Sequence, residues 1–156
     1  ERGVVNALYA YSTGTESGGD PEKYMERYPG DDYIDIIGLD FYCFSPNSAE
    51  EACALYKQKV EKNVPMLCQV AKEHGKVAAI TETGYEGLGS NDWWTKTLLP
   101  NISQYPVSYV LVWRNADDKP GHFYAPYPGH PSIPDFVKFY KDKRTLFAKD
   151  LKGFYK

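Results

Sequence analysis

Four short segments of nearly continuous apolar sequence constrain the fold more than any other feature of this chain. Each segment is rich in β-branched and aromatic residues, and stretches with helical periodicity lie between them. Continuous apolar runs, rather than an alternation of apolar and polar residues, are typical of parallel strands that are buried on both faces. The predicted strands comprise residues 4–12, 34–42, 76–83 and 107–115.

The segments that follow these strands carry the sequence signals of helices. Asp20 before Pro21 forms an N-cap and first turn, and Ser48 followed by Glu51 matches a capping box. Pro65 is predicted to kink or split the second helix, and Pro100 to interrupt the third. The predicted helices comprise residues 21–28, 48–73, 91–104 and 132–151.

The alternation of strand and helix predicts an α/β fold with parallel strands and right-handed crossovers. An open doubly wound sheet and a (β/α)8 TIM barrel both have this pattern. The glycines of residues 13–20 have neither P-loop nor dinucleotide-binding spacing. Polar and aromatic side chains end all four strands, which favours the barrel, because barrels draw catalytic groups from several strand ends. A complete barrel takes about 250 residues, and this chain carries about four of its βα units.

Composition and charge exclude several partners and cofactors. The net charge is −3, and 18 scattered Lys and Arg face 21 Asp and Glu, so no basic stripe for nucleic acid exists. We find no apolar run that reaches the roughly 18 residues of a membrane span, and no signal segment opens the chain. No metal, cofactor or disulfide framework is predicted, because the cysteines and histidines lack ligand-like spacing. These residues are Cys43, Cys53, Cys68, His74, His122 and His130.

The ends of the predicted strands carry the candidate site residues. Glu82 follows an apolar run, and a carboxylate at such a rim is costly unless neighbours hydrogen-bond it, which indicates a function. The alternative is a loop cap or a salt bridge to Arg114. Asp40 and Tyr42 lie two residues apart and therefore share a face, from which the phenol could keep a carboxylate ionised or instead hydrogen-bond the backbone as a buried tyrosine. Trp113 and Arg114 pair a stacking platform with a five-donor fork, or serve ordinary packing.

Three motifs, in this order, resemble the carboxyl-terminal half of glycoside hydrolase family 26, whose best-known members are endo-β-1,4-mannanases. They are YPGDDYIDIIGLDFY at 28–42, ITETGYEG at 80–87 and YVLVWRNADDKPGHFYAPYPGHP at 109–131. The resemblance implies a (β/α)8 barrel of retaining glycosidases, with an acid/base glutamate ending strand four and a nucleophile ending strand seven. Residues 1–156 would then be the half of the catalytic barrel that carries strands five to eight.

The resemblance also implies a role for each candidate residue. Glu82 is the catalytic nucleophile, Tyr42 hydrogen-bonds it, and Asp40 belongs to the polar network of the sugar-binding cleft. Trp113 forms the aromatic floor beneath the sugar at the cleavage point, and Arg114 contacts the next sugar toward the non-reducing end. His122 lies in a matching loop motif, and no role is assigned to it.

The acid/base motif on strand four is absent from the chain. Glu16 and Glu86 are poor substitutes, because neither is held on a second strand that faces Glu82. We therefore expect the chain alone to be inactive. It is read as a piece of a longer polypeptide, and self-association through unpaired barrel edges is the alternative.

The expected activity is hydrolysis of internal β-1,4-mannosidic linkages in mannan, galactomannan or glucomannan. The motifs also allow a β-glucanase or β-1,3-xylanase of the same family. A non-catalytic carbohydrate-binding protein on this fold is a further alternative, against which an ionised Glu82 argues. Because the substrate is an extracellular polymer, the resemblance implies a secreted, cell-surface or periplasmic parent.

Overall fold

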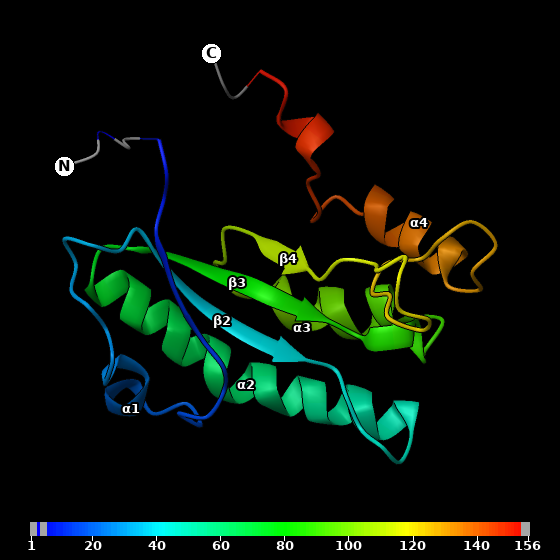
Figure 1. The fold of residues 1–156 in the computed structure, drawn as a ribbon, viewed down its shortest axis with the longest axis horizontal. Helices are drawn as coiled ribbons and strands as arrows, with labels where there is room; N and C mark the ends of the chain where they lie inside the picture. Colours follow the sequence, from blue (N-terminus) through cyan, green and yellow to red (C-terminus); the bar gives the residue numbers. More distant parts are fainter. Residues whose placement is uncertain (1–2, 4–5, 154–156) are drawn as a thin grey trace.

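A parallel sheet in the order β1-β2-β3-β4 forms the centre of the computed structural model, which describes residues 3 and 6–153. The strands are β1 (Ala10–Thr13), β2 (Ile36–Tyr42), β3 (Val77–Gly84) and β4 (Val110–Val112). Figure 1 shows β2, β3 and β4 in this order across the sheet, and helical structure follows each strand along the chain. This confirms the predicted succession of parallel βα units.

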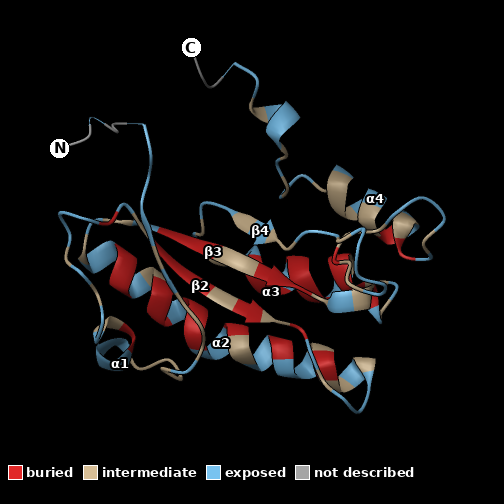
Figure 2. Ribbon diagram, viewed as in Figure 1, coloured by how far each residue is buried: buried red, intermediate tan, exposed pale blue. Residues whose placement is uncertain are grey.

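Helices lie on one side of the sheet. They are α1 (Pro21–Met25), α2 (Ala49–Glu73), α3 (Leu99–Ile102) and α4 (Ile133–Lys141), with a π-helical stretch, Trp94–Leu98, directly before α3. The long helix α2 packs across β2 and β3 (Figure 1), and α4 packs on the π-helical stretch before α3. Buried positions follow both strands and α2 in Figure 2. In the part of the chain that the structure describes, no helix is long and apolar enough to cross a membrane.

The face of β2 that packs on α2 differs in chemistry from its other face. Ile37, Leu39 and Phe41 are buried in the core, and the Phe41 ring lies 5.2 Å from that of Tyr56 on α2. The residues between them, Gly38 and Asp40, point to the other face by the alternation of a strand. In a closed barrel this second face lines the interior, where the sugar-binding end is expected.

Helix α2 begins as predicted but is not split. Ser48 Oγ accepts a hydrogen bond from the Glu51 backbone N–H at 3.1 Å, while the Glu51 carboxylate accepts from Ser45 and Asn47. The helix runs through Pro65 without a break. Pro65 lies on the exposed side, where water can satisfy the carbonyl that loses its partner.

The apolar run at the start of the chain is largely not a strand. Residues 4–5 lie outside the described residues, and 6–9 precede β1, with Leu8 and Tyr9 exposed. Tyr9 instead bonds the loop before β2: its N–H donates to the Asp35 carboxylate at 2.8 Å, and its carbonyl accepts from the Asp35 N–H at 2.9 Å. The predicted fourth strand, 107–115, is likewise shortened to Val110–Val112.

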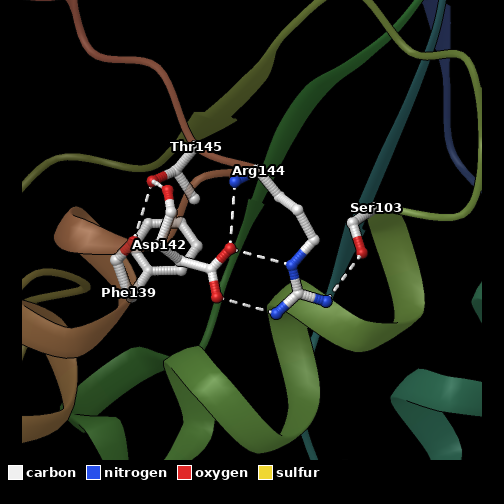
Figure 3. A network of polar contacts seen from close by, with 5 residues as sticks. All are labelled: Ser103, Phe139, Asp142, Arg144 and Thr145. Atoms are coloured by element: carbon white, nitrogen blue, oxygen red, sulfur yellow. Dashed lines mark hydrogen bonds and ion pairs between the residues drawn. The ribbon is translucent and has the colours of Figure 1, made fainter.

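The prediction of one helix over 132–151 is wrong, because side chains compete with the backbone after residue 141. Asp142 Oδ1 accepts from the Arg144 backbone N–H at 2.9 Å, and Thr145 Oγ1 donates to the carbonyl of Phe139 at 2.8 Å (Figure 3). Such local bonds replace helical ones. Arg144 also holds both carboxylate oxygens of Asp142 and lies 3.5 Å from Ser103 Oγ. A short 3₁₀ turn, Ala148–Leu151, follows.

Pro100 does not interrupt the third helical segment. It lies on the exposed side of this helical segment, where water can satisfy the carbonyl that loses its partner. Helical structure therefore continues from Trp94 to Ile102.

Hydrogen bonds that depend on an ionised carboxylate join the loop before β2 to the end of α2. Asp31 Oδ1 accepts from Tyr28 Oη and lies 2.8 Å from His74 Nδ1. These hydrogen bonds from Tyr28 and His74 lower the pKa of Asp31 below its ordinary value. A lowered folded-state pKa contributes stability above the unfolded pKa of about 3.9, and this contribution is lost as the pH falls through the folded value.

Below about pH 4 the unaltered chain loses the contribution of ionised Asp31, whereas Asp31→Asn has no such contribution to lose. We therefore expect the free energy of unfolding to fall less with decreasing pH in Asp31→Asn than in the unaltered chain. Urea unfolding followed by tryptophan fluorescence, repeated between pH 3 and pH 7, measures it. Asp32→Asn is the control, since the neighbouring carboxylate makes none of these contacts in the described structure. Equal pH dependence in the Asp31 variant and the unaltered chain would contradict this role.

Candidate active site

Two neighbouring strands bring Asp40, Tyr42 and Glu82 together at their carboxyl ends. Asp40 on β2 and Glu82 on β3 are partners across the ladder, and Tyr42 pairs with Gly84. The Tyr42 phenol donates a hydrogen bond to Glu82 Oε1. All three side chains are partly exposed, so the carboxylate is accessible and has a fixed donor beside it.

A β-bulge puts Glu82 on this face. Leu39 pairs with Ile80 and Asp40 with Glu82, so Thr81 is an extra residue in β3. Ile80 belongs to the core, and Thr83 Oγ1 lies 2.9 Å from the phenol of Tyr56 on α2, so both face the helices although they are three positions apart. A regular strand would turn Glu82 toward the helices with Ile80. The bulge turns it toward the open end instead.

Thr81 is held by residues of β1 and β2. Its Oγ1 donates to the Leu39 carbonyl at 3.0 Å and lies 2.5 Å from Ser12 Oγ on β1. Gly38 makes room for it, because a β-carbon there would lie 2.3 Å from Thr81 Cγ2. The glycine and the threonine together therefore fix the bulge that aims Glu82.

We expect Gly38→Ala to displace Thr81, lower the free energy of unfolding by about 1–3 kcal/mol and disturb the bulge. Gly14→Ala is a matched control: its added β-carbon meets only the terminal carboxylate of Glu16, a flexible side chain. Urea unfolding of both variants gives the comparison. Equal stability of the two would show that Thr81 is not confined in this way.

Burial and the carboxylates of the site keep Tyr42 protonated. Burial, followed by the hydrogen bond and negative charge of Glu82, raises the pKa of Tyr42 well above its ordinary value. Burial also raises the pKa of Asp40, and the charges of Glu82 and Glu16 add to this. Tyr42 is therefore protonated, and able to donate to Glu82, at neutral and mildly acidic pH.

Trp113 and Arg114 follow β4 and lie next to the Glu82 strand. The Trp113 N–H donates to the Thr83 carbonyl at 2.9 Å, and its side chain is partly exposed. Arg114 is exposed, and among the described residues it makes neither an ion pair nor a hydrogen bond with Glu82. The alternative of a salt bridge between Glu82 and Arg114 is therefore not formed among the described residues, and Tyr42 supplies the hydrogen-bond donor.

A second group of side chains, to which the sequence analysis assigned no role, lies behind Tyr42. Tyr124 is buried, and its ring centroid lies 5.5 Å from that of Tyr42. His122 packs edge-on against Tyr124, and its Nδ1 lies 2.6 Å from Glu86 Oε1. The sequence signal was the aromatic run of residues 122–124, whose place in the fold depends on a loop that no local pattern predicts. No group of three or more metal-ligating side chains occurs in residues 3 and 6–153.

An apolar groove of about 790 Å³ lies away from this site, between β4, α3 and the segment after α4. Its lining is mostly aromatic and aliphatic, with Trp94, Phe136 and Phe147 among the larger side chains. The residues that line this groove include no Asp or Glu, whereas Asp40 and Glu82 lie together near the carboxyl ends of β2 and β3.

Comparison with protein families identifies residues 1–115 as glycosyl hydrolase family 26. The chain belongs to glycoside hydrolase family 26. A curated mannan endo-1,4-β-mannosidase from Bifidobacterium adolescentis is 32% identical over 160 aligned residues, which cover 93% of this chain and 16% of that protein. The residues that match the family contain the first two motifs, at 28–42 and 80–87, and residues 109–115 of the third.

Solved structures place the family 26 chain within a known fold. A β-mannanase from Bacteroides ovatus is 49% identical, with a TM-score of 0.90 over 99% of this chain and 42% of that one. An endo-β-1,4-mannanase from Bacillus sp. JAMB-750 is 30% identical, with a TM-score of 0.78 over 94% of this chain and 41% of that one. The chain therefore has part of the family's TIM-barrel fold and spans less than half the length of these relatives.

Proposed function

We propose that this chain is the carboxyl-terminal half of a retaining endo-β-1,4-mannanase, with Glu82 as its catalytic nucleophile. The observation that carries the proposal is the Glu82 carboxylate at the end of β3, aimed by a bulge and hydrogen-bonded by Tyr42. It occurs in a chain that is 49% identical to a β-mannanase of nearly the same fold. Residues 1–156 then supply barrel strands five to eight.

In the proposed mechanism, a Glu82 oxygen attacks the anomeric carbon of a mannosyl unit. The bond to the leaving sugar breaks, and a carboxylic acid about 5–5.5 Å away protonates the departing oxygen. That acid is supplied by the other half of the barrel. It then removes a proton from water, which attacks the same carbon and releases Glu82, so the anomeric configuration is retained.

Neighbouring side chains have separate tasks in this proposal. Tyr42 holds the Glu82 carboxylate in place and stabilises its charge through the hydrogen bond. Asp40 contacts sugar hydroxyls in the cleft, Trp113 stacks beneath the sugar at the cleavage point, and Arg114 binds the next sugar toward the non-reducing end. No cofactor takes part.

The setting of the parent protein follows from the same proposal. Mannan is an extracellular polymer, so we expect a secreted or surface-exposed parent.

Strands β1 and β4 end the described sheet, and each has one strand neighbour in it. We expect strands from the other barrel half to pair with these edges, or those of a second copy if the chain self-associates.

A chimera tests the activity: this chain replaces the part of the Bacteroides ovatus β-mannanase that it matches. Release of reducing ends is measured on galactomannan, glucomannan, lichenan and β-1,3-xylan. We expect hydrolysis of the two mannans by the chimera and none by residues 1–156 alone. Preference for lichenan or xylan would contradict the assigned substrate, and activity of the chain alone would contradict the need for a second half.

A further inference from the structure

Tyr124 is a buried aromatic residue beside the site that the proposed mechanism leaves unused. Only 6% of its surface is exposed, and its ring is tilted by 57° against that of Tyr42. Tyr42 in turn donates to Glu82. Movement of the Tyr124 ring would therefore leave space into which the donor of Glu82 could turn.

The backbone after Glu82 confines one side of the Tyr124 ring. A β-carbon at Gly84 would lie 2.4 Å from Tyr124 Cδ1. Only glycine permits so close an approach of ring and strand. The ring of Tyr124 therefore packs between the end of β3 and the ring of Tyr42.

The residue after Arg114 fixes the backbone of Tyr124. Asn115 Oδ1 accepts from the N–H groups of Tyr124 and Ala125, at 2.8 and 2.9 Å. Its Nδ2 donates to the Ala125 carbonyl at 2.9 Å. Because Asn115 follows β4, the loop that carries Tyr124 is tied to the sheet rather than left free.

The Glu86–His122 pair confines the remaining edge of the ring. His122 lies 5.3 Å from Tyr124, with the two rings nearly perpendicular at 88°. The hydrogen bond between His122 Nδ1 and Glu86 limits rotation of the imidazole. Gly84 and His122 therefore confine the ring, Asn115 fixes the backbone that carries it, and the ring packs on Tyr42.

We propose that Tyr124 is a positioning residue whose ring keeps the Tyr42 phenol directed at Glu82. This inference rests on the proposed function of Glu82 as nucleophile. The flat ring performs the task, and the Tyr124 hydroxyl does not. Tyr124 acts only through Tyr42 and touches neither the sugar nor Glu82.

A double-mutant cycle in the chimera tests this inference, with hydrolysis of an aryl β-mannobioside as the assay. We expect Tyr42→Phe to lower kcat on the order of 10²-fold, as does removal of a preorganised donor elsewhere. Tyr124→Leu should lower kcat about 10-fold with little change in KM, and Tyr124→Phe should match the unaltered chimera. With Tyr42→Phe already present, Tyr124→Leu should cause no further loss.

The number of active sites separates positioning from simple destabilisation. Unfolding lowers the number of active enzyme molecules, which titration with a 2-deoxy-2-fluoro-β-mannobiosyl fluoride counts, whereas a misplaced donor lowers kcat per active site in both Tyr42→Phe and Tyr124→Leu. If Tyr124→Leu fails to fold, Asn115→Ala, which releases the loop without removing a ring, should give the same loss of kcat per active site. An unchanged kcat per active site in the variant that folds overturns the inference.

Other outcomes also have definite meanings. Additive losses in the cycle would show that Tyr124 does not act through Tyr42, and a change in KM alone would make it a substrate contact. A chimera that loses no activity with Glu82→Ala would overturn the proposed function itself. An active, Glu82-dependent chimera that tolerates Tyr124→Leu would overturn the positioning role alone.

Discussion

Replacement of Glu82 by alanine is expected to lower kcat of the chimera on mannan by at least about 10⁴-fold, the scale on which loss of a catalytic nucleophile acts. The reason is that no other carboxylate can form the glycosyl-enzyme bond from this strand end. Glu73→Ala serves as the control, because Glu73 ends α2 and bonds only Gln69 in the described structure. Its kcat should remain within about two-fold.

Added azide distinguishes loss of a nucleophile from loss of folding. With an aryl β-mannobioside, azide should enter the space vacated in Glu82→Ala and restore turnover. Because it attacks from the side of the missing carboxylate, the product should be the α-mannobiosyl azide, which NMR identifies. Restoration of activity with a β-configured product would rule out Glu82 as the attacking group.

Substitution of two tryptophans should distinguish an effect on stability from an effect on catalysis. Trp93 is completely buried, and its ring centroid lies 4.9 Å from that of Trp94 and 6.0 Å from that of Tyr56. Trp93→Ala is expected to lower the free energy of unfolding by roughly 3–5 kcal/mol, since it removes a large core side chain. Urea unfolding of the chimera, followed by far-ultraviolet circular dichroism, measures this.

Trp113→Ala is the matched control with the opposite expectation. The Trp113 side chain is partly exposed after β4 and belongs to the proposed sugar platform. Its loss should change the free energy of unfolding by about 1 kcal/mol or less. It should weaken kcat/KM on mannan by roughly 30-fold, the effect of removing an aromatic anchor worth about 2 kcal/mol. A larger loss of stability from Trp113→Ala than from Trp93→Ala would reverse the two roles.

The fold was predictable where local patterns are strong. Asp20 and Ser48 cap helices as expected, and the apolar runs around Ile37 and Ile80 form central strands. The prediction of a strand over the first apolar run was largely wrong, because hydrophobicity alone does not say whether a partner strand is present to cover Leu8 and Tyr9. The last helix was overextended, because the bonds around Asp142 and Thr145 compete with helical ones and leave no trace in periodicity.

The candidate site shows the same division. The position of Glu82 at a strand end follows from the sequence, but its orientation depends on the extra residue Thr81. The bulge depends on the register of β3 with β2 and on the space that Gly38 leaves for Thr81. Both involve residues that lie far apart in the sequence. Tyr124 was missed for a related reason: it reaches Tyr42 only because Asn115 folds the intervening loop back onto the sheet.

Covalent trapping is the most direct test of the central claim that Glu82 is the nucleophile of a retaining mannanase. A 2-deoxy-2-fluoro-β-mannobiosyl fluoride supplies a leaving group that departs without acid assistance, and its fluorine slows the second step. After incubation with the chimera and proteolysis, mass spectrometry should find one glycosylated peptide, with the sugar on Glu82. A label on Glu86 or Asp40, or none in a chimera that hydrolyses mannan, would contradict this account.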